Sequence, residues 1–248
     1  GEAATLCSNA LLRGARGNSG VILSLLFRGL AKSLKGKTDC DAAEWAKAMR
    51  EGVDAAYSAV MKPAEGTILT VSRVGTTAAV ELSKNEDSME LVLACALAAA
   101  KDALEETTEQ NPVLKRAGVV DAGGQGWIYV LKGLLLAIEG NPVERADGTV
   151  EASTAPTAGA TVNEEIKFGY CTECIVEKSK KYIGEGSAPE FKEYISGLGD
   201  SVVFIDDEKL IKLHVHTNDP GAVLSHGIVF GSLMTVKIEN MREQHTAL

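Results

Sequence analysis

The sequence lacks any apolar run long enough to cross a membrane. Its longest apolar stretch covers residues 91–100 and is bounded by Glu90 and Lys101, whereas a membrane-spanning helix needs about 20 apolar residues. The start of the chain also lacks the basic segment and apolar segment that together make a secretion signal. These absences predict a cytoplasmic protein without a membrane span.

Basic residues are few relative to acidic ones. The chain has 25 Lys and Arg against 34 Asp and Glu, which gives a net charge of −9 at pH 7. This balance argues against nucleic acid or an anionic membrane as the main partner. A phosphate site would therefore need local hydrogen-bond donors.

Cysteine is also infrequent, with five in 248 residues. Cys7, Cys40 and Cys95 are scattered among helical patterns, which predicts buried free thiols in a reducing compartment. The remaining two, Cys171 and Cys174, belong to a different pattern that is described below.

Hydrophobic periodicity divides the chain into two regions. Residues 1–140 show a three- and four-residue apolar repeat and predict an all-α domain. Its predicted helices cover residues 2–15, 19–34, 41–61, 67–83, 88–109 and 122–139. Residues 141–161 are rich in small, polar and turn-forming residues, which predicts a linker.

Residues 162–248 alternate short strands and helices. Strands are predicted over 166–177, 202–206, 210–216 and 233–238, and helices over 189–196 and 222–229. This β-α-β-β-α-β order is that of the ferredoxin-like sandwich, in which the first and third strands are central neighbours. The predicted fold class is therefore a multidomain chain, with an all-α antiparallel helical domain followed by an α+β ferredoxin-like sandwich.

Three loops of the helical domain are candidates for one anion site. Short connections make successive helices antiparallel, so the first, third and fifth loops should share an end. These are Gly14–Gly20, Lys62–Gly66 and Asn111–Gly124, and each precedes a helix whose unpaired amides could face a phosphate. Taken singly, each loop could instead contain only helix caps, such as Thr67 and Asp121.

A second cluster is predicted on the sandwich. His214 and His216 alternate on one strand and face the same side, and Cys171 should lie on the neighbouring central strand. One thiolate and two imidazoles suit zinc, with three protein ligands and an open fourth position, for which His226 and His245 are further candidates. The alternative is a pair of structural, hydrogen-bonded histidines. Cys174 points to the opposite face, which favours the core over a redox pair with Cys171.

At the three glycine-containing loops of the helical domain, the chain resembles the nucleotide-binding (DAK2, DhaL-like) domain of the dihydroxyacetone-kinase family. Within that family it resembles the catalytic subunit of bacterial fatty acid kinases. The similar stretches are residues 14–24, 62–70, 120–126 and 237–245. The resemblance implies a barrel of antiparallel helices with ATP at one mouth. The resemblance implies that the phosphates are held by Gly17, Asn18, Ser19 and Gly20. It also implies that the nucleotide is bordered by Thr67, Asp121, Gly123 and Gly124.

The same resemblance implies a zinc site at Cys171, His214 and His216 in the second domain. It also implies a reaction in which a fatty acid, presented by a separate carrier protein, is phosphorylated to an acyl phosphate. A homodimer through the second domain is expected as well.

One departure from the family bears on catalysis. The family holds magnesium with a run of the type Asp-Gly-Asp-Thr-Gly, which this sequence does not contain, and Asp39 and Asp41 are at the wrong end of the predicted bundle. Phosphoryl transfer depends on such metal ions. We therefore expect an internal piece of a longer kinase that is inactive alone. The alternatives are a non-catalytic, zinc-binding assembly module and a kinase for a small hydroxyketone.

Overall fold

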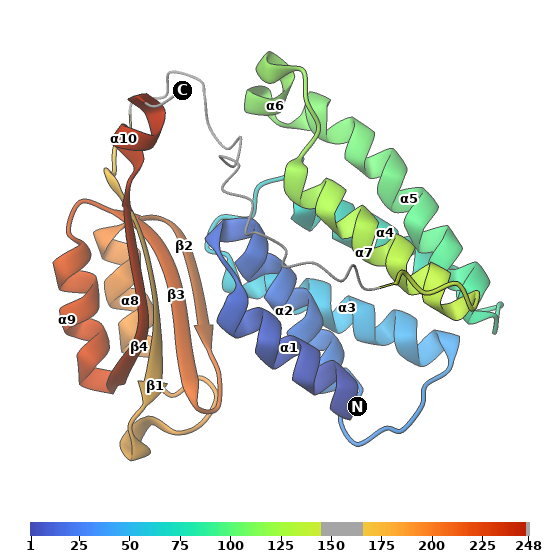
Figure 1. The fold of residues 1–248 in the computed structure, drawn as a ribbon, viewed down its shortest axis with the longest axis horizontal. Coiled ribbons are helices and arrows are strands. Elements are labelled where there is room, and N and C mark those ends of the chain that lie inside the picture. The colour runs from blue at the N-terminus through green and yellow to red at the C-terminus, as the bar shows by residue number, and fades with distance from the viewer. Residues whose placement is uncertain (145–165, 247–248) are drawn as a thin grey trace. The chain divides into compact units, whose positions relative to one another are not determined.

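The computed structural model describes residues 1–144 and 166–246. The helices of its first part are α1 (Glu2–Gly14), α2 (Gly17–Ser33), α3 (Ala42–Ala59), α4 (Ile68–Leu82), α5 (Met89–Gln110), α6 (Pro112–Ala117) and α7 (Ala122–Ile138) (Figure 1). Six of them match the predicted helices. The short α6 was not predicted, and it exists because Asn111 caps its start, Pro112 fits its first position and Gly118 ends it with a φ of 65°.

Close packing of α2 against α3 depends on two glycines. A Cβ atom on Gly29 would lie 2.3 Å from the carbonyl oxygen of Glu51, and one on Gly52 would lie 2.3 Å from that of Leu26. Any side chain at either position would therefore collide with backbone. The many small residues of this region thus allow its helices to approach closely.

The second part contains a four-stranded sheet. Its elements are β1 (Tyr170–Lys178), the short 3₁₀ turn η1 (Lys180–Tyr182), α8 (Pro189–Leu198), β2 (Gly199–Asp206), β3 (Leu210–Thr217), α9 (Pro220–Phe230), β4 (Gly231–Asn240) and α10 (Met241–Thr246). The strand order is β2-β3-β1-β4, and every neighbouring pair is antiparallel. The predicted ferredoxin-like order, with β1 beside β3 at the centre, is confirmed. β1 begins four residues later than predicted, because the amide of Gly169 donates to the side chain of Asn218.

Helices α8 and α9 cover one face of this sheet (Figure 1). Phe191 of α8 and Phe230 of α9 stack with ring centroids 4.9 Å apart, and both are buried against Leu213 and Val176 of the central strands. Cys174 belongs to the same core, as predicted. The opposite face carries the alternate residues of β1 and β3, which include the predicted metal ligands.

Contacts between residues divide the chain into two compact units, whose boundaries differ from those between the helical part and the part that contains the sheet. One unit contains residues 1–9, 22–55 and 64–162, and the other contains 10–21, 56–63 and 163–248. The turn between α1 and α2 therefore belongs to the same unit as the sheet. The predicted linker, 141–161, lies mostly outside the described residues, and the predicted boundaries at 140 and 162 stay predictions.

The prediction that Cys7, Cys40 and Cys95 are buried was wrong. Cys7 is exposed and the other two are half-buried, although all five cysteines are free thiols. Helix α1 buries Ser8 and Leu12, and Cys7 is one residue out of step with that face.

Among the described residues, no helix is both long and apolar enough to cross a bilayer.

Candidate functional site

The glycine-rich turn lies between α1, which ends at Gly14, and α2, which begins at Gly17. Gly17 has a φ of +61°, a left-handed conformation that favours glycine. The first turn of α2 itself has no acidic residue, but its first amide, that of Gly17, donates to the carboxylate of Glu173 at 2.7 Å, which partly offsets the partial positive charge of the helix N-terminus. Ser19 is exposed, and Gly17, Asn18 and Gly20 are half-buried.

Asn18 contributes an unsatisfied polar atom to this turn. Its Oδ1 is buried, and no hydrogen-bond partner for it occurs in the described part of the chain. A buried acceptor without a partner is costly. A bound donor or cation would satisfy it.

Two of the three predicted loops meet in the first unit. The Asp121 carboxylate accepts from the amide of Gly124 at 2.7 Å and also from the amides of Gly123 and Ile68. Ile68 follows Thr67, the N-cap of α4, so the starts of α4 and α7 lie together. Burial raises the pKa of the Asp121 carboxyl, and the three amides oppose that rise. Convergence of these loops with Gly14–Gly20, which belongs to the other unit, stays a prediction.

Capping also accounts for several of these residues. The Thr67 hydroxyl accepts from the amide of Leu69 at 3.3 Å and donates to the carbonyl of Ala64 at 2.8 Å. A Cβ atom on Gly124 would lie 2.8 Å from a methyl group of Val71 and 2.9 Å from one of Leu104, so packing by itself favours glycine there. The nucleotide role of Thr67, Asp121, Gly123 and Gly124 is therefore still a prediction.

Asp41, which the predicted topology places at the wrong end of the bundle to hold magnesium, lies in a capping box. Its carboxylate accepts from the amide of Glu44 at 2.8 Å, and Glu44 accepts from the amide of Asp41 at 3.4 Å. This reciprocal pair explains the acidic residues before α3 without a metal.

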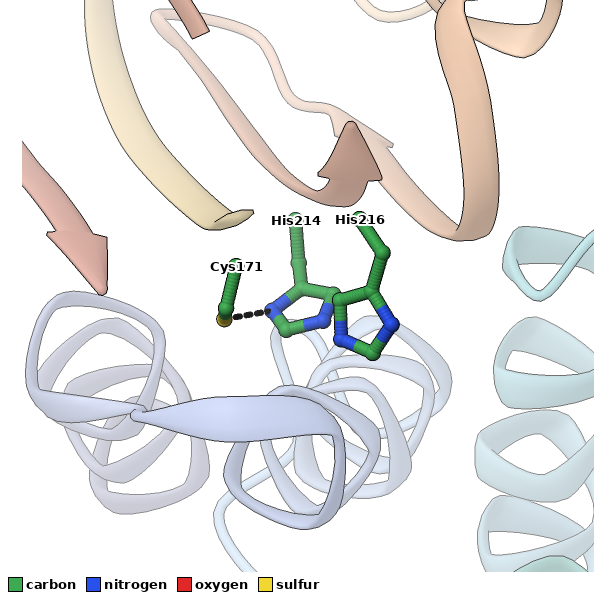
Figure 2. Close-up of side chains that lie close together, drawn as sticks. All are labelled: Cys171, His214 and His216. Carbon is green, nitrogen blue, oxygen red and sulfur yellow. Dashed lines mark hydrogen bonds between the residues drawn. The ribbon is translucent and has the colours of Figure 1, made fainter. Parts of the chain in front are cut away.

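Figure 2 shows the predicted metal ligands Cys171, His214 and His216 close together. One ligand atom from each lies within 4.8 Å of the others, and no further group of three or more candidate ligands occurs among the described residues. Cys171 pairs with His216 across β1 and β3, and its Sγ is 3.9 Å from Nδ1 of His214. The sheet register thus assembles three residues that are far apart in the sequence.

Each histidine has a carboxylate near its Nδ1. The Nδ1 atom of His214 is 3.0 Å from Oε1 of Glu173, and that of His216 is 3.6 Å from Oδ1 of Asp200. The Nε2 atom of His214 is buried and, within the described chain, has no hydrogen-bond partner. Metal-binding histidines typically donate one ring N–H to a carboxylate and bind the ion through the other nitrogen. The arrangement fits that pattern.

The protonation states of these groups argue against a reactive thiol, and metal ligation by Cys171 requires displacement of its proton. Burial, together with Glu173 and Glu239, raises the pKa of Cys171 to about 11, so the thiol is protonated at neutral pH unless a metal displaces its proton. Burial and the neighbouring His214 lower the pKa of His216, which keeps that imidazole neutral and able to ligate. Burial raises the pKa of Cys174 to about 12, which argues against a redox pair.

The fourth-ligand predictions have different outcomes. His226 stacks on Tyr194 with centroids 3.9 Å apart, and both belong to the helices that cover the other face of the sheet. His226 therefore does not belong to the cluster of Cys171, His214 and His216. The side chain of His245 lies outside the described residues.

Sequence analysis missed Glu173 and Lys212, both buried charged residues on the ligand-bearing face. The pKa of Glu173 is lowered: burial alone would raise it, but His214, the amide of Gly17 and Lys212 outweigh burial. Burial lowers the pKa of Lys212, and Glu173 opposes this shift. A usable signal existed, because both residues alternate with the predicted ligands on otherwise apolar strands.

Family comparisons agree with the resemblance seen in the sequence. Residues 1–136 match the model of the DAK2 domain, and residues 167–248 match that of the middle domain of FakA-like fatty acid kinase proteins. Both models belong to a kinase family.

Curated relatives extend over the whole chain. Protein YloV of Bacillus subtilis is 42% identical over 257 residues, which cover 100% of this chain and 46% of that protein. Uncharacterized proteins of Staphylococcus saprophyticus and Staphylococcus aureus are each 43% identical, covering 99% of this chain and 45% of theirs. The chain thus spans about half the length of these relatives. It belongs to the DAK2-domain family of fatty acid kinase-like proteins, in which a helical DAK2 domain is followed by a FakA-like middle domain.

Proposed function

We propose that this chain carries the ATP-binding part of a kinase that phosphorylates a fatty acid to an acyl phosphate. A fatty-acid-binding carrier protein would present the acceptor carboxylate. The observation that carries the proposal is the turn at Gly14–Gly20, which starts a 17-residue helix whose own first turn has no acidic residue and in which Ser19 is exposed. The matches to the DAK2 domain and the middle domain support it.

In this proposal the phosphates of ATP bind at the start of α2. Gly17, Asn18, Ser19 and Gly20 would surround them. The amides of Asn18, Ser19 and Gly20 would donate to the phosphates, because the first amides of a helix lack intrahelical acceptors and carry partial positive charge. Gly17, whose own amide donates to Glu173, would supply the left-handed turn. Thr67, Asp121, Gly123 and Gly124 would border the nucleotide. Magnesium would neutralise charge between the phosphates, and the described residues contain no carboxylate group of three or more to hold it. We therefore expect weak, nearly magnesium-independent ATP binding and no phosphoryl transfer by this chain alone.

Calorimetric titration with ATP, with and without magnesium, tests the nucleotide site. Ser19→Asp places a negative charge at the start of α2, where it suits the helix dipole but repels phosphate, so we expect stable protein and at least about tenfold weaker binding. Ser179→Asp is the matched control, since Ser179 is exposed and its side chain makes no capping bond. Binding unaffected by Ser19→Asp would contradict the phosphate assignment. Tight, magnesium-dependent binding would contradict the expected weakness.

We further propose that Cys171, His214 and His216 hold zinc, with the fourth position open to water or another ligand. The supporting observation is the buried, unpartnered Nε2 of His214 beside a neutral imidazole and a thiol. Metal analysis should give about one zinc per chain, lost in Cys171→Ser and kept in Cys7→Ser, which changes an exposed thiol. Less than about half a zinc per chain, unchanged by Cys171→Ser, would reject the site.

A second candidate function is a non-catalytic assembly module, favoured by the edge strand β4. Met234, Val236 and Ile238 are exposed there although they are large and apolar, and an exposed apolar edge strand is prone to pair with another chain. We propose a homodimer through this strand. Sedimentation should show a dimer that Val236→Lys converts to monomer.

A kinase for a small hydroxyketone is less favoured, because the second family model extends over residues 167–248.

A further inference from the structure

One oxygen of Glu173 contacts both a candidate metal ligand, His214, and the glycine-rich turn at Gly14–Gly20. Its Oε1 accepts from the amide of Gly17 at 2.7 Å and lies 3.0 Å from Nδ1 of His214. The Glu173 side chain is only 9% exposed, so water competes little for these bonds. The first amide of α2 and a candidate zinc ligand thus share a single acceptor.

Lys212 holds the other side of the same turn. Its Nζ donates to the carbonyl of Leu12 at 2.8 Å and to that of Ala15 at 2.7 Å, where α1 ends. Lys212 is two residues from His214 on β3 and is only 2% exposed, so it projects from the ligand-bearing face of the sheet. Two buried charges of opposite sign therefore fix the end of α1 and the start of α2.

We propose that Glu173 is a positioning residue that couples metal binding at Cys171, His214 and His216 to the geometry of the Gly14–Gly20 turn. This inference rests on the proposed metal site and gives the proposed phosphate turn a regulator. A metal on Nε2 of His214 leaves the ring proton on Nδ1, which is 3.0 Å from Oε1 of Glu173 and 3.9 Å from Sγ of Cys171, so the carboxylate is the nearer acceptor for that proton. The carboxylate is then held in the orientation that accepts from Gly17.

Removal of the metal releases that constraint. His214 can then carry its proton on Nε2, and its unprotonated Nδ1 no longer donates to Glu173. The carboxylate loses one of its two anchors, so its bond to Gly17 opens more often. Because binding linkage is reciprocal, a ligand that orders the turn would also strengthen metal binding.

Hydrogen–deuterium exchange of peptides covering residues 14–21 tests this coupling without any nucleotide. Zinc-loaded protein should exchange these amides about tenfold more slowly than chelator-treated protein. Glu173→Ala should still bind about one zinc per chain but show fast exchange that zinc does not change. Glu177→Ala is the matched control, because Glu177 is exposed on the same face of β1 and should behave as the unmodified chain does.

The conservative variant separates coupling from a loss of folding. Glu173→Gln keeps an oxygen that can accept from both Gly17 and His214, so it should retain most of the zinc-dependent protection. That result would support the proposal even if Glu173→Ala failed to fold.

Three outcomes would overturn the coupling: no zinc bound to the unmodified chain, exchange in it that is independent of bound zinc, or zinc-dependent protection that survives in Glu173→Ala. Failure of ATP to bind would reject the nucleotide proposal alone, since the exchange measurement requires no ATP.

Discussion

The helical region and the sheet region bury different kinds of polar group. In the described part of the helical region, the buried polar side chains are the hydroxyls of Ser8, Ser24, Thr70, Ser72, Thr76 and Thr107. The described sheet region buries four ionisable side chains, which are Glu173, Lys178, Lys212 and His214. Both regions therefore have polar interiors, but of the described residues only those of the sheet region include ionisable side chains that are fully buried.

This contrast reflects how each interior is specified. The buried hydroxyls of Ser72 and Thr107 bond within their own helical turns, to the carbonyls of Leu69 and Leu104. Buried charges need partners from distant segments, as Lys212 finds in Leu12 and Ala15. An uncompensated buried charge is far more costly than an unbonded hydroxyl. The sheet region should therefore be less tolerant of substitution at its polar positions.

Lys178, whose side chain is fully buried, should give the strongest effect. It pairs with Asp206 and donates to Ser187 at 2.9 Å. Lys178→Met leaves Asp206 without its cation, and we expect the free energy of unfolding to fall by about 3–5 kcal/mol. Urea denaturation measures this. Lys180→Met, at an exposed site nearby, should change it by less than about 0.5 kcal/mol. Equal effects of the two variants would remove the contrast between buried and exposed charge.

Removal of the proposed zinc ion should have the second-largest effect on stability. At zinc concentrations about one hundredfold above the dissociation constant, binding stabilises the folded state by about 2.7 kcal/mol. Chelation should therefore lower the melting temperature and speed hydrogen exchange in β1 and β3, with little change in α5. Uniform acceleration in α5 and the sheet would show that the metal does not act on the sheet region selectively.

Next in size is substitution at Gly29, where a Cβ atom would lie 2.3 Å from a carbonyl oxygen. Gly29→Ala should destabilise the helical region by about 1–3 kcal/mol. Gly133→Ala in α7, where a Cβ atom would meet nothing within 4 Å, should stabilise it by about 0.8–1 kcal/mol through helix propensity. Fluorescence follows this region because both tryptophans, Trp45 and Trp127, lie in it. Effects of the same sign would refute the importance of close helix packing.

The weakest effect should be the pH dependence contributed by Asp121. Its pKa is raised in the folded state, mainly by burial, so the folded protein binds this proton more tightly than the unfolded chain. Its contribution to stability should thus fall as pH rises from the ordinary value of 3.8 through the raised pKa, and stay constant above it. Asp121→Asn keeps the capping acceptor and should lack this slope. The unfolding free energy of the unmodified chain minus that of Asp121→Asn, measured from pH 3 to 7, should decrease as pH rises. An increase would show that the pKa of Asp121 is lowered in the folded state.

Much of the fold could be predicted because it depends on local pattern. The apolar repeat of 42–59 and the alternation of 210–217 determine a helix and a strand wherever they lie in the chain. The meeting of Cys171, His214 and His216 on one face of the sheet was also predictable, since period two fixes a face and the β-α-β-β-α-β order fixes which strands are neighbours. The exposure of Cys7 was not, because one residue of error in helical phase moves a side chain off the buried face.

Local sequence was enough for the elements, the strand order and the types of chemical group available at each loop. Packing in three dimensions set what those groups contact. It brought the oxygen of Glu173 to both Gly17 and His214, and the ammonium of Lys212 to the end of α1. The physical reason is that such bonds join distant segments, 156 residues apart for Gly17 and Glu173, so their geometry depends on packing that no local pattern encodes.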